Sequence, residues 1–395
     1  MTAYLLFLRT YPRHVSFGFL LTFFSSLGQT FLISLYVPHI LAELSLSNSM
    51  FGSMYATATV TSSLLLMTFG GRIDHRPLNL YLYKTMAALG IASLALGLVY
   101  HPLLLPIALL GIRFSGQGLM THISQTVMGR YFEQDRGKAL SLSALGFSVG
   151  EMIFPIVITF LIPLVGWRIS LMLNALVLLV IMVPVLQFLP MGEMDNPKNK
   201  PANAVPAQWK ILKHSFFWML APAVALQSFT NTGVFFYQLV LAESRGWSPE
   251  WYALAFSGYA LSRFTFGLIG GPLVDKYSAR KLFPLMLIPL ILGLIVLALI
   301  PLRWGGLVFL LLAGVSTGMS SPIKSAAIAE LYGTSSLGGV RSVYTAFMVM
   351  GTALGPMVFG IFLDAGIGFS PILLGAGVLL ALSSLNSLRL HLQLR

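Results

Sequence analysis

Four ionisable side chains, Arg113, Glu151, Arg263 and Lys324, fall within long apolar stretches of the sequence rather than beside them. If these stretches cross a membrane, each charge at the bilayer centre costs about 2.5 to 3.5 kcal/mol. Such residues are retained when they face a cavity or a partner, so they indicate a pathway for a polar solute. A carboxyl group can carry a proton, and a guanidinium or ammonium group can bind an anion.

Glu151 lies near the middle of the apolar stretch 138–163, in the segment GFSVGEMIFPI. A similar segment, GTALGPMVFGI, begins at Gly351 and has Pro356 in place of the acid. The glycines are common to both copies, so helix packing requires them and not the carboxyl group. A carboxyl group whose protonation changes with its exposure is what coupling to a proton gradient requires. We predict that Glu151 is the proton-coupling residue; a substrate contact and an ion pair with an arginine are the alternatives.

The other three ionisable residues, Arg113, Arg263 and Lys324, are cations, so each requires a binding partner or a polar surrounding. Arg113 stays charged at any relevant pH, so it either pairs with Glu151 or binds the substrate. Arg263 offers two parallel donors that fit a carboxylate in a low-dielectric cavity, so we predict that it binds an anionic substrate. Lys324 is close to the C-terminal end of its stretch, and we expect its ammonium group to reach the lipid headgroups. The neighbouring Pro322 leaves the alternative that the helix opens locally and the ammonium group turns inward.

The elements that hold these side chains must be membrane helices. The chain of 395 residues is 56% apolar and 9% charged, whereas soluble globular proteins average roughly 25% charged residues. About 20 residues at 1.5 Å each cross a hydrocarbon layer of roughly 30 Å. The apolar stretches of this length are 15–38, 48–70, 78–99, 103–128, 138–163, 167–189, 214–240, 248–271, 282–301, 304–329, 340–363 and 369–388. We predict an all-α membrane protein with twelve transmembrane helices. The first stretch is too long for the core of a signal peptide, so we expect it to remain as a helix.

The distribution of basic residues predicts the orientation of the chain. Most Lys and Arg residues fall in loops on the side of the N-terminus, and the opposite loops hold Arg168, Arg245 and Arg303. Because basic loops stay in the cytoplasm, we expect a multi-pass protein of the cytoplasmic (inner) membrane with both termini in the cytoplasm. The net charge of +12 is spread over these loops, which indicates topology and anionic lipid rather than a nucleic-acid partner.

The twelve stretches divide six and six around one polar connection rich in Pro, Asn and Lys. We predict an N-terminal half at 1–190, a cytoplasmic linker at 191–213 and a C-terminal half at 214–395. Motifs recur at equivalent helices: GGRID begins at Gly70, and GGPLVD begins at Gly270. The recurrence predicts two pseudo-symmetric six-helix halves, with a substrate site between them near the membrane midplane.

These repeats and loops resemble the major facilitator superfamily, and the resemblance covers nearly the whole chain. The family's motif lies between helices 2 and 3 and has a Gly, then an Asp four residues later, then basic residues. The resemblance implies a conformational latch, in which a carboxylate caps a neighbouring helix or pairs with an arginine. The residues assigned to the latch are Gly70, Asp74, Arg76, Arg136, Gly271, Asp275, Arg280 and Arg341. The alternative is that these charges only set the topology of the loops.

The resemblance also implies that helices 1, 4, 7 and 10 line the central cavity. Together with Arg113 and Arg263, the polar residues selected for substrate binding are Gln29, Tyr36, Gln117, His122, Gln227, Asn231, Tyr237 and Tyr344. For each of these, an interhelical hydrogen bond is the alternative. The Ser-Arg pair that ends at Arg263 resembles the monocarboxylate and oxalate/formate transporters, in which this arginine holds the substrate carboxylate.

Together these features predict a secondary active transporter that moves a small, monocarboxylate-like organic anion with protons by alternating access. The alternative within transport is a proton-driven exporter of drugs or other lipophilic or cationic compounds, favoured by the Gly-x-x-x-Gly arrangement and the aromatic content. The alternative of another class is a receptor or scaffold that transports nothing. We expect a monomer whose partners are a small-molecule substrate, protons and membrane lipid, with no cofactor and no metal.

Enzyme motifs do not support a catalytic function. The segment Gly146–Gly150 fits the G-x-S-x-G pattern of serine hydrolases, but that pattern requires a strand-turn-helix elbow and not a membrane helix. The sequence contains no H-E-x-x-H and no G-x-x-x-x-G-K-[ST]. We therefore predict that the protein is not an enzyme and that a gradient supplies its energy. The absence of cysteine excludes disulfides and thiolate metal sites.

Overall fold

The computed structural model describes residues 2–74, 76–132, 135–182, 187–195, 208–332 and 337–392. In these ranges the regular elements are helices, and no strand occurs among them. The chain forms two compact units. The first consists of Met1–Leu46 and Thr57–Ala202, and the second consists of Ser47–Ala56 and Asn203–Arg395.

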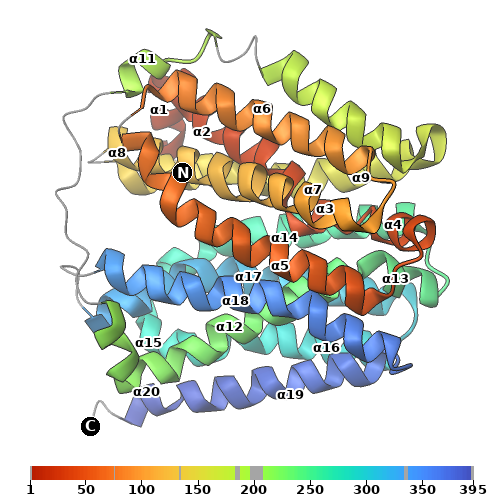
Figure 1. Ribbon diagram of the computed structural model, residues 1–395. Coiled ribbons are helices and arrows are strands. Elements are labelled where there is room, and N and C mark those ends of the chain that lie inside the picture. Colours follow the sequence, from red (N-terminus) through yellow and green to blue (C-terminus); the bar gives the residue numbers. More distant parts are fainter. Residues whose placement is uncertain are drawn as a thin grey trace. The chain divides into compact units, whose positions relative to one another are not determined.

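The first unit is built from helices that are repeatedly interrupted (Figure 1). Helix α5 (Asn48–Phe69) is shared, because its first residues belong to the second unit. The other elements are α1 (Thr2–Thr10), α2 (Pro12–Ser25), η1 (Ser26–Gly28), α3 (Thr30–Ile33), α4 (Val37–Leu44), η2 (Gly70–Asp74), α6 (Leu78–Gly97), η3 (Pro102–Leu104), α7 (Leu105–Ile112), the π-helix η4 (Arg113–Met120), α8 (Thr121–Tyr131), α9 (Arg136–Val177), the π-helix η5 (Leu178–Met182) and α11 (Met191–Met194).

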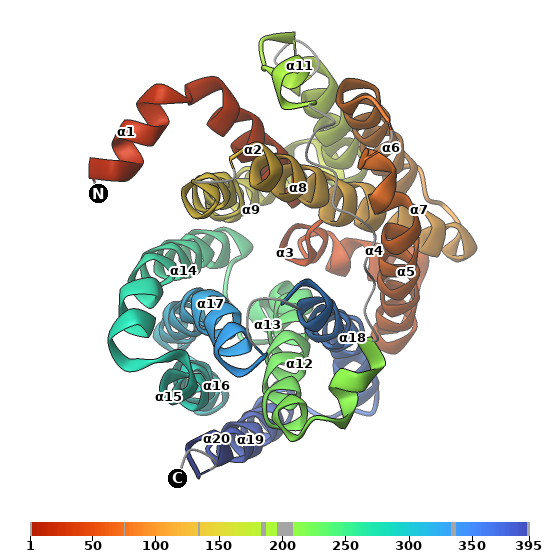
Figure 2. The same cartoon turned by 90° about the vertical axis from the view of Figure 1, so that its left-hand side faces the viewer.

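The second unit contains longer uninterrupted helices, several of which run side by side in Figure 1. Its elements are η7 (Gln208–Lys213), α12 (Ser215–Phe236), α13 (Gln238–Ser244), α14 (Pro249–Tyr277), α15 (Ala279–Leu282), η8 (Phe283–Leu287), α16 (Ile288–Leu299), α17 (Arg303–Tyr332), α18 (Leu337–Asp364), α19 (Phe369–Ser387) and α20 (Arg389–Leu392). In this unit α14 packs on α17, α12 packs on α18, and α16 lies between α17 and α19, as Figure 2 also shows.

The prediction of an all-α protein with twelve membrane helices is confirmed. In the described residues, seven helices are long and apolar enough to cross a membrane. One of them contains two spans, because Gly166 has a φ of +81° and breaks α9. The remaining four spans are less apolar or are interrupted: the first breaks at Gln29 and the seventh at Tyr237, and the other two are α5 and α14.

The repeated glycines pack the equivalent pair of helices in each unit. In the first unit, a Cβ at Gly146 or Gly150 of α9 would overlap atoms of the first span, including the backbone oxygen of Phe19. In the second unit, Gly351 and Gly355 of α18 lie against the backbone of α12 in the same way. Small residues allow membrane helices to approach closely, where dispersion contacts replace the missing hydrophobic driving force.

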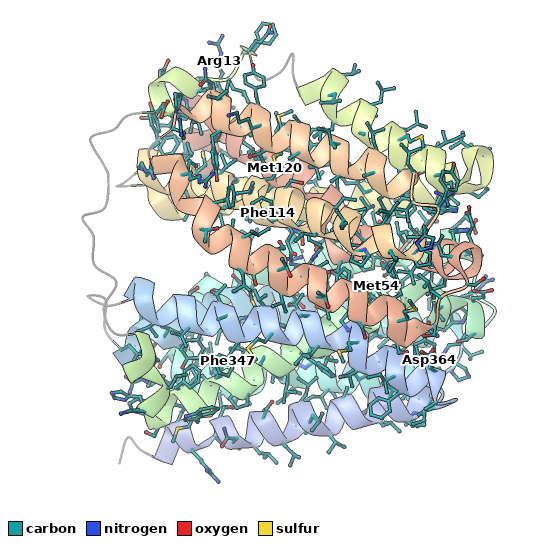
Figure 3. All side chains as sticks on the ribbon, in the orientation of Figure 1. Arg13, Met54, Phe114, Met120, Phe347 and Asp364 are labelled. Carbon is teal, nitrogen blue, oxygen red and sulfur yellow. The ribbon has the colours of Figure 1, made fainter. Side chains whose placement is uncertain are left out.

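Aromatic side chains fill the same α12–α18 contact at its other end. Phe347 of α18, labelled in Figure 3, packs edge-on against Phe217 of α12, with ring centroids 5.0 Å apart. Tyr344, one turn earlier on α18, lies 5.1 Å from the same ring. Aromatic pairs in these geometries add about 0.5 to 1.5 kcal/mol each beyond the area they bury. The packed α12–α18 pair forms one side of a cavity in the second unit.

Candidate functional site

A cavity of about 400 Å³ lies within the second unit, between α12, α14, α17 and α18. Four residues selected from the sequence line it: Gln227, Asn231, Arg263 and Tyr344. Helical periodicity explains the gathering of polar groups, because residues three, four and seven positions apart share a face. Thus α12 contributes Gln227 and Asn231 from one face, and α17 contributes residues 317, 321, 324 and 328 from another.

Hydrogen bonds between α12 and α17 orient the amides in the cavity wall. The Nε2 of Gln227 donates to Ser320 Oγ at 2.7 Å, and its Oε1 accepts from Lys324 Nζ at 3.5 Å. One turn further along α12, the Nδ2 of Asn231 donates to Thr317 Oγ1 at 3.1 Å. These bonds hold the side-chain amides in one orientation, so the cavity presents fixed polar groups.

Two cations, Arg263 and Lys324, line this cavity, and none of its described lining residues carries a carboxylate. The expectation that Lys324 reaches the lipid headgroups is wrong, because its ammonium group contacts Gln227 in the cavity wall. The signal that favours this position is the spacing of Thr317, Ser321 and Lys324, which puts the lysine on the polar face of α17. A polar cavity with this charge suits an anion.

Arg113 is placed by a break in the first span. The helix ends at Gly28, and Gln29 is extended with φ −85° and ψ 152°. This break leaves carbonyl groups without intrahelical partners. The Nη1 of Arg113 donates to the Gly28 oxygen at 3.1 Å and to Thr30 Oγ1 at 3.3 Å, and Arg113 is only 1% exposed. The guanidinium therefore satisfies backbone oxygen at membrane depth, where water is not available for that purpose.

The first span makes a close backbone contact with the fourth span at the point where it breaks. A Cβ at Gly28 would lie 2.8 Å from the Cα of Gly116 in η4, and the reverse is equally tight. The π-helix η4 begins at Arg113, and π-helical segments occur frequently at functional sites. Gln117 lies in η4, and Gln29 lies at the break, so both predicted residues are in irregular backbone.

Glu151 is buried, at 6% exposed, on the part of α9 that precedes Gly166. The adjacent Gly150 packs against Ser26 of the broken first span. The acid is thus on the same unit as Arg113 and belongs to a helix whose close approach depends on its glycines. The prediction that Glu151 couples transport to protons depends on this burial in a membrane helix.

Besides Gln227 and Asn231, three more predicted residues make interhelical hydrogen bonds, which was the alternative for each. The hydroxyl group of Tyr36 lies 3.1 Å from Ser170 Oγ and accepts from Asn174 Nδ2 at 3.0 Å. The hydroxyl group of Tyr237 donates to the backbone oxygens of Asn48, at 2.8 Å, and Pro356, at 3.0 Å. The Nε2 of His122 lies 3.1 Å from the Gly70 oxygen, which joins the fourth span to the predicted latch.

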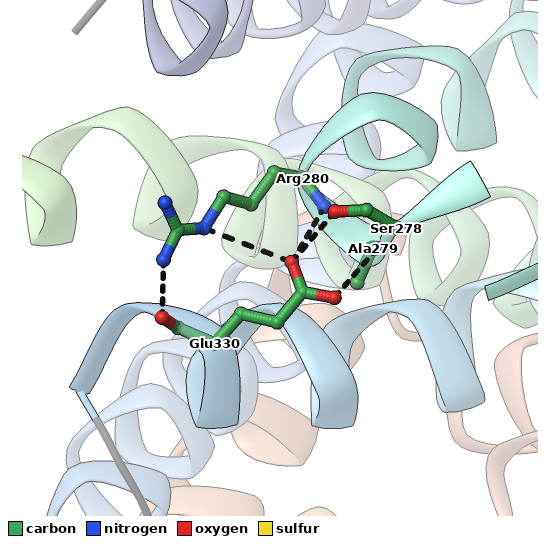
Figure 4. Close-up of polar contacts among 4 residues, drawn as sticks. All are labelled: Ser278, Ala279, Arg280 and Glu330. Carbon is green, nitrogen blue, oxygen red and sulfur yellow. Dashed lines mark hydrogen bonds and ion pairs between the residues drawn. The ribbon is translucent and has the colours of Figure 1, made fainter. Parts of the chain in front are cut away.

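The second predicted latch contains a carboxylate that is not among the residues predicted from the sequence. Glu330, near the end of α17, accepts from Ser278 Oγ and Ala279 N, each at 2.9 Å, and from Arg280 N at 3.2 Å (Figure 4). The Nε of Arg280 lies 3.7 Å from the same carboxylate, and its Nη2 donates to the Glu330 backbone oxygen. Glu330 therefore caps the helical segment that begins at Ala279.

The first unit has a comparable cap. The backbone N–H of Leu78, at the start of α6, donates to Asp195 Oδ2 at 2.9 Å. Of the other latch residues, Gly271 lies in α14 and Arg76 is exposed. The side chains of Asp74, Arg136, Asp275 and Arg341 lie outside those that the structure describes. In the described part of the chain, no group of His, Asp or Glu side chains is arranged to hold a metal ion.

Twelve membrane helices in two repeated sets, with a polar cavity inside one set, define a membrane transporter and not an enzyme. The family model described as Major Facilitator Superfamily matches residues 18–251 and 219–392. This chain therefore belongs to the major facilitator superfamily. A search of the curated proteins finds no match.

Solved structures share this fold. A bacterial homologue of the human lysosomal transporter Spinster, in an inward-facing and occupied conformation, matches with a TM-score of 0.75 and 15% identity over 97% of each chain. The nucleoside transporter NupG matches with a TM-score of 0.74 and 13% identity, over 96% of this chain and 99% of that one. At these identities the likeness shows the common fold.

Proposed function

We propose that this protein is a secondary active transporter of a small organic anion, driven by protons and working by alternating access. The observation that carries the proposal is the cavity of the second unit, which is lined by Arg263 and Lys324 and by no described carboxylate. In a low-dielectric surrounding, the ammonium group of Lys324 needs an anion to offset its desolvation. A small carboxylate supplies that charge and fits the fork of a guanidinium.

Proton coupling is assigned to Glu151. Its burial in α9 and the absence of an acid at the equivalent Pro356 support a role other than packing. In this scheme the carboxyl group is protonated when it is exposed to the side of higher proton concentration and loses its proton on the other side. The protein is a monomer of the cytoplasmic membrane, with both termini in the cytoplasm.

The rival within transport is export of lipophilic or cationic compounds. The two cations of the cavity disfavour a cationic substrate, because like charges in a low-dielectric site repel strongly. Nucleosides also belong among the compounds to be tested, because NupG shares this fold.

Flux measurements in proteoliposomes test the proposal. Small carboxylates should be accumulated when a proton gradient is imposed, while lipophilic cations and nucleosides should not. Glu151→Gln should abolish proton-driven accumulation and leave counterflow intact, whereas Glu243→Gln, at an exposed position on α13, should change neither. Accumulation by Glu151→Gln with an unchanged pH dependence would rule out the assignment of Glu151. The absence of any solute flux would favour a receptor or scaffold.

A further inference from the structure

We propose that the cavity of the second unit binds a carboxylate whose chain also carries a hydrogen-bond donor far from the charge. Lys324 takes the carboxylate, and the Oδ1 of Asn231 takes the donor. This inference rests on the proposed function and narrows its substrate from organic anions in general to hydroxylated carboxylates, with the hydroxyl group remote from the acid.

The charged end of the site is Lys324. Its Nζ has one hydrogen-bond partner in the described part of the chain, the amide oxygen of Gln227 at the long distance of 3.5 Å, and no ion pair there. An ammonium group has three donors, so at least two remain for a ligand. Burying such a charge in a membrane helix is unfavourable unless an anion compensates for it. Arg263 lines the same cavity and adds positive charge to it.

The uncharged end of the site is Asn231. Its Nδ2 donates to Thr317 Oγ1 at 3.1 Å, and in this orientation its Oδ1 is the opposite arm of the amide. This oxygen is buried, has no hydrogen-bond partner among the described residues, and belongs to a residue that lines the cavity. An unsatisfied buried acceptor costs about 1 to 3 kcal/mol, so the site favours a ligand that donates to it. Gln227, by contrast, has partners on both arms of its amide.

The separation of the two ends defines the shape of the ligand. Lys324 contacts Gln227, and Asn231 lies four residues further along α12, which is about 6 Å at a rise of 1.5 Å per residue. A hydroxyl group on the carbon beside the carboxylate does not reach this far, whereas one at the far end of a short chain does. The cavity volume of about 400 Å³ is within the usual range for small-molecule sites. Aldonic acids and terminal hydroxy acids have this arrangement.

The first test uses the intact wild-type protein, purified in detergent, and three acids of equal chain length: caproate, α-hydroxycaproate and ε-hydroxycaproate. Calorimetric titration should show that ε-hydroxycaproate binds at least about tenfold more tightly than either of the others, because it alone satisfies both ends of the site. Equal affinity for all three acids would overturn the inference and leave anion transport intact. If the protein binds and transports no carboxylate, the proposed function fails as well.

The second test assigns the preference to Asn231. Asn231→Leu removes the acceptor and should bind ε-hydroxycaproate and caproate equally. Asn386→Leu is the matched control, because Asn386 donates to the Trp218 oxygen and does not line the cavity. It should keep the tenfold preference. Retention of the preference by Asn231→Leu would overturn the assignment of this residue, and the wild-type titrations stand alone if that variant does not fold.

Discussion

At the scale of single residues, the buried charge of Lys324 has two opposite effects. It lowers the stability of the unliganded protein and raises the affinity of the cavity for an anion. Its ammonium group lies in a membrane helix with only a long contact to Gln227 among the described residues. Removing an uncompensated charge from such a place relieves desolvation, whereas removing it from an anion site loses a charged hydrogen bond. The first effect changes the melting temperature of the protein, and the second changes its affinity for carboxylates.

Lys324→Met keeps most of the side-chain length and removes the charge. We expect carboxylates to bind at least about tenfold more weakly to this variant, since a hydrogen bond to a charged group contributes about 1.5 to 3 kcal/mol. We also expect the melting temperature without ligand to be equal to that of the wild type or higher. Titration and differential scanning fluorimetry check the two parts. A lower melting temperature with unchanged carboxylate affinity would mean that Lys324 is structural.

Glu43, outside the membrane spans, provides a prediction about pH. The hydrogen bond from the Arg168 guanidinium, at 2.9 Å, and that from Trp167 Nε1, at 2.7 Å, hold the pKa of Glu43 below its ordinary value of 4.5. The stabilisation is therefore fully present above the unfolded-state pKa and is lost as the pH falls through the lower folded-state pKa. Because the pair is partly exposed, its contribution is below about 1 kcal/mol.

Comparison of the wild type with Glu43→Gln tests whether the stabilisation by Glu43 is lost as the pH falls. The wild type should melt at a higher temperature near neutral pH, and the difference should shrink as the pH falls below about 4.5, the ordinary pKa of a glutamate. Fluorimetric melting curves at closely spaced pH values measure this difference. A difference that stays constant down to about pH 3 would mean that the charge of Glu43 has no part in it.

The sequence allowed several cavity residues to be selected, but it led to the wrong position for Lys324. Gln227, Asn231 and Arg263 attract attention because they are polar in apolar stretches, and all three line the cavity. Lys324 was assigned to the headgroups because its distance along the helix from the membrane surface is short enough for snorkelling. Only the placement of α12 beside this face of α17 shows that Gln227 is the group it contacts. Contacts between helices distant in sequence are not encoded in the periodicity of either one.

At the scale of elements, the structure depends on where helices break and where two helices approach closely. The glycine pattern of α9 and α18 predicts close packing in both units, and both helices do approach a neighbour at these glycines. The break at Gln29 and the π-helix that begins at Arg113 have no such sequence signal. Both lie where Gly28 contacts Gly116, and this contact joins two segments that are far apart in the sequence.

Gly355→Ala tests the close approach of α18 to α12. Its Cβ would overlap the Phe229 carbonyl oxygen and would lie 2.9 Å from the Gly233 nitrogen, which are backbone atoms that cannot rotate away. We expect a loss of about 1 to 3 kcal/mol in unfolding free energy from overpacking. Gly375→Ala on α19 is the matched control, because nothing lies within 4 Å of its Cβ. There the higher helix propensity of Ala should raise stability by up to about 1 kcal/mol. Equal effects at the two positions, in denaturant titrations, would contradict the packing argument.

At the scale of the whole molecule, the sequence predicts the fold from its repeat of six helices and the membrane orientation from its distribution of charge. Membrane helices are nearly determined by their length and hydropathy, because every backbone polar group must be satisfied inside the bilayer. The twelve-helix fold was therefore predictable, including the four spans whose helices in the structure are less apolar or interrupted. The orientation of these helices depends on loop charge, which acts during insertion and leaves no contact to observe.

The lack of cysteine makes the orientation directly testable. Gly137→Cys lies in the first turn of α9, at the end of the fifth span that we predict to be cytoplasmic, and has no neighbour within 4 Å of its Cβ. Leu302→Cys lies between α16 and α17, in a predicted external loop, and that side chain is 65% exposed. A membrane-impermeant maleimide should label Leu302→Cys in intact cells and Gly137→Cys only after lysis, with the cysteine-free protein as a blank. Because each span reverses direction, the two positions must lie on opposite faces of the membrane. Labelling of both in intact cells would contradict the span count between them, and the reversed pattern would contradict the positive-inside assignment alone.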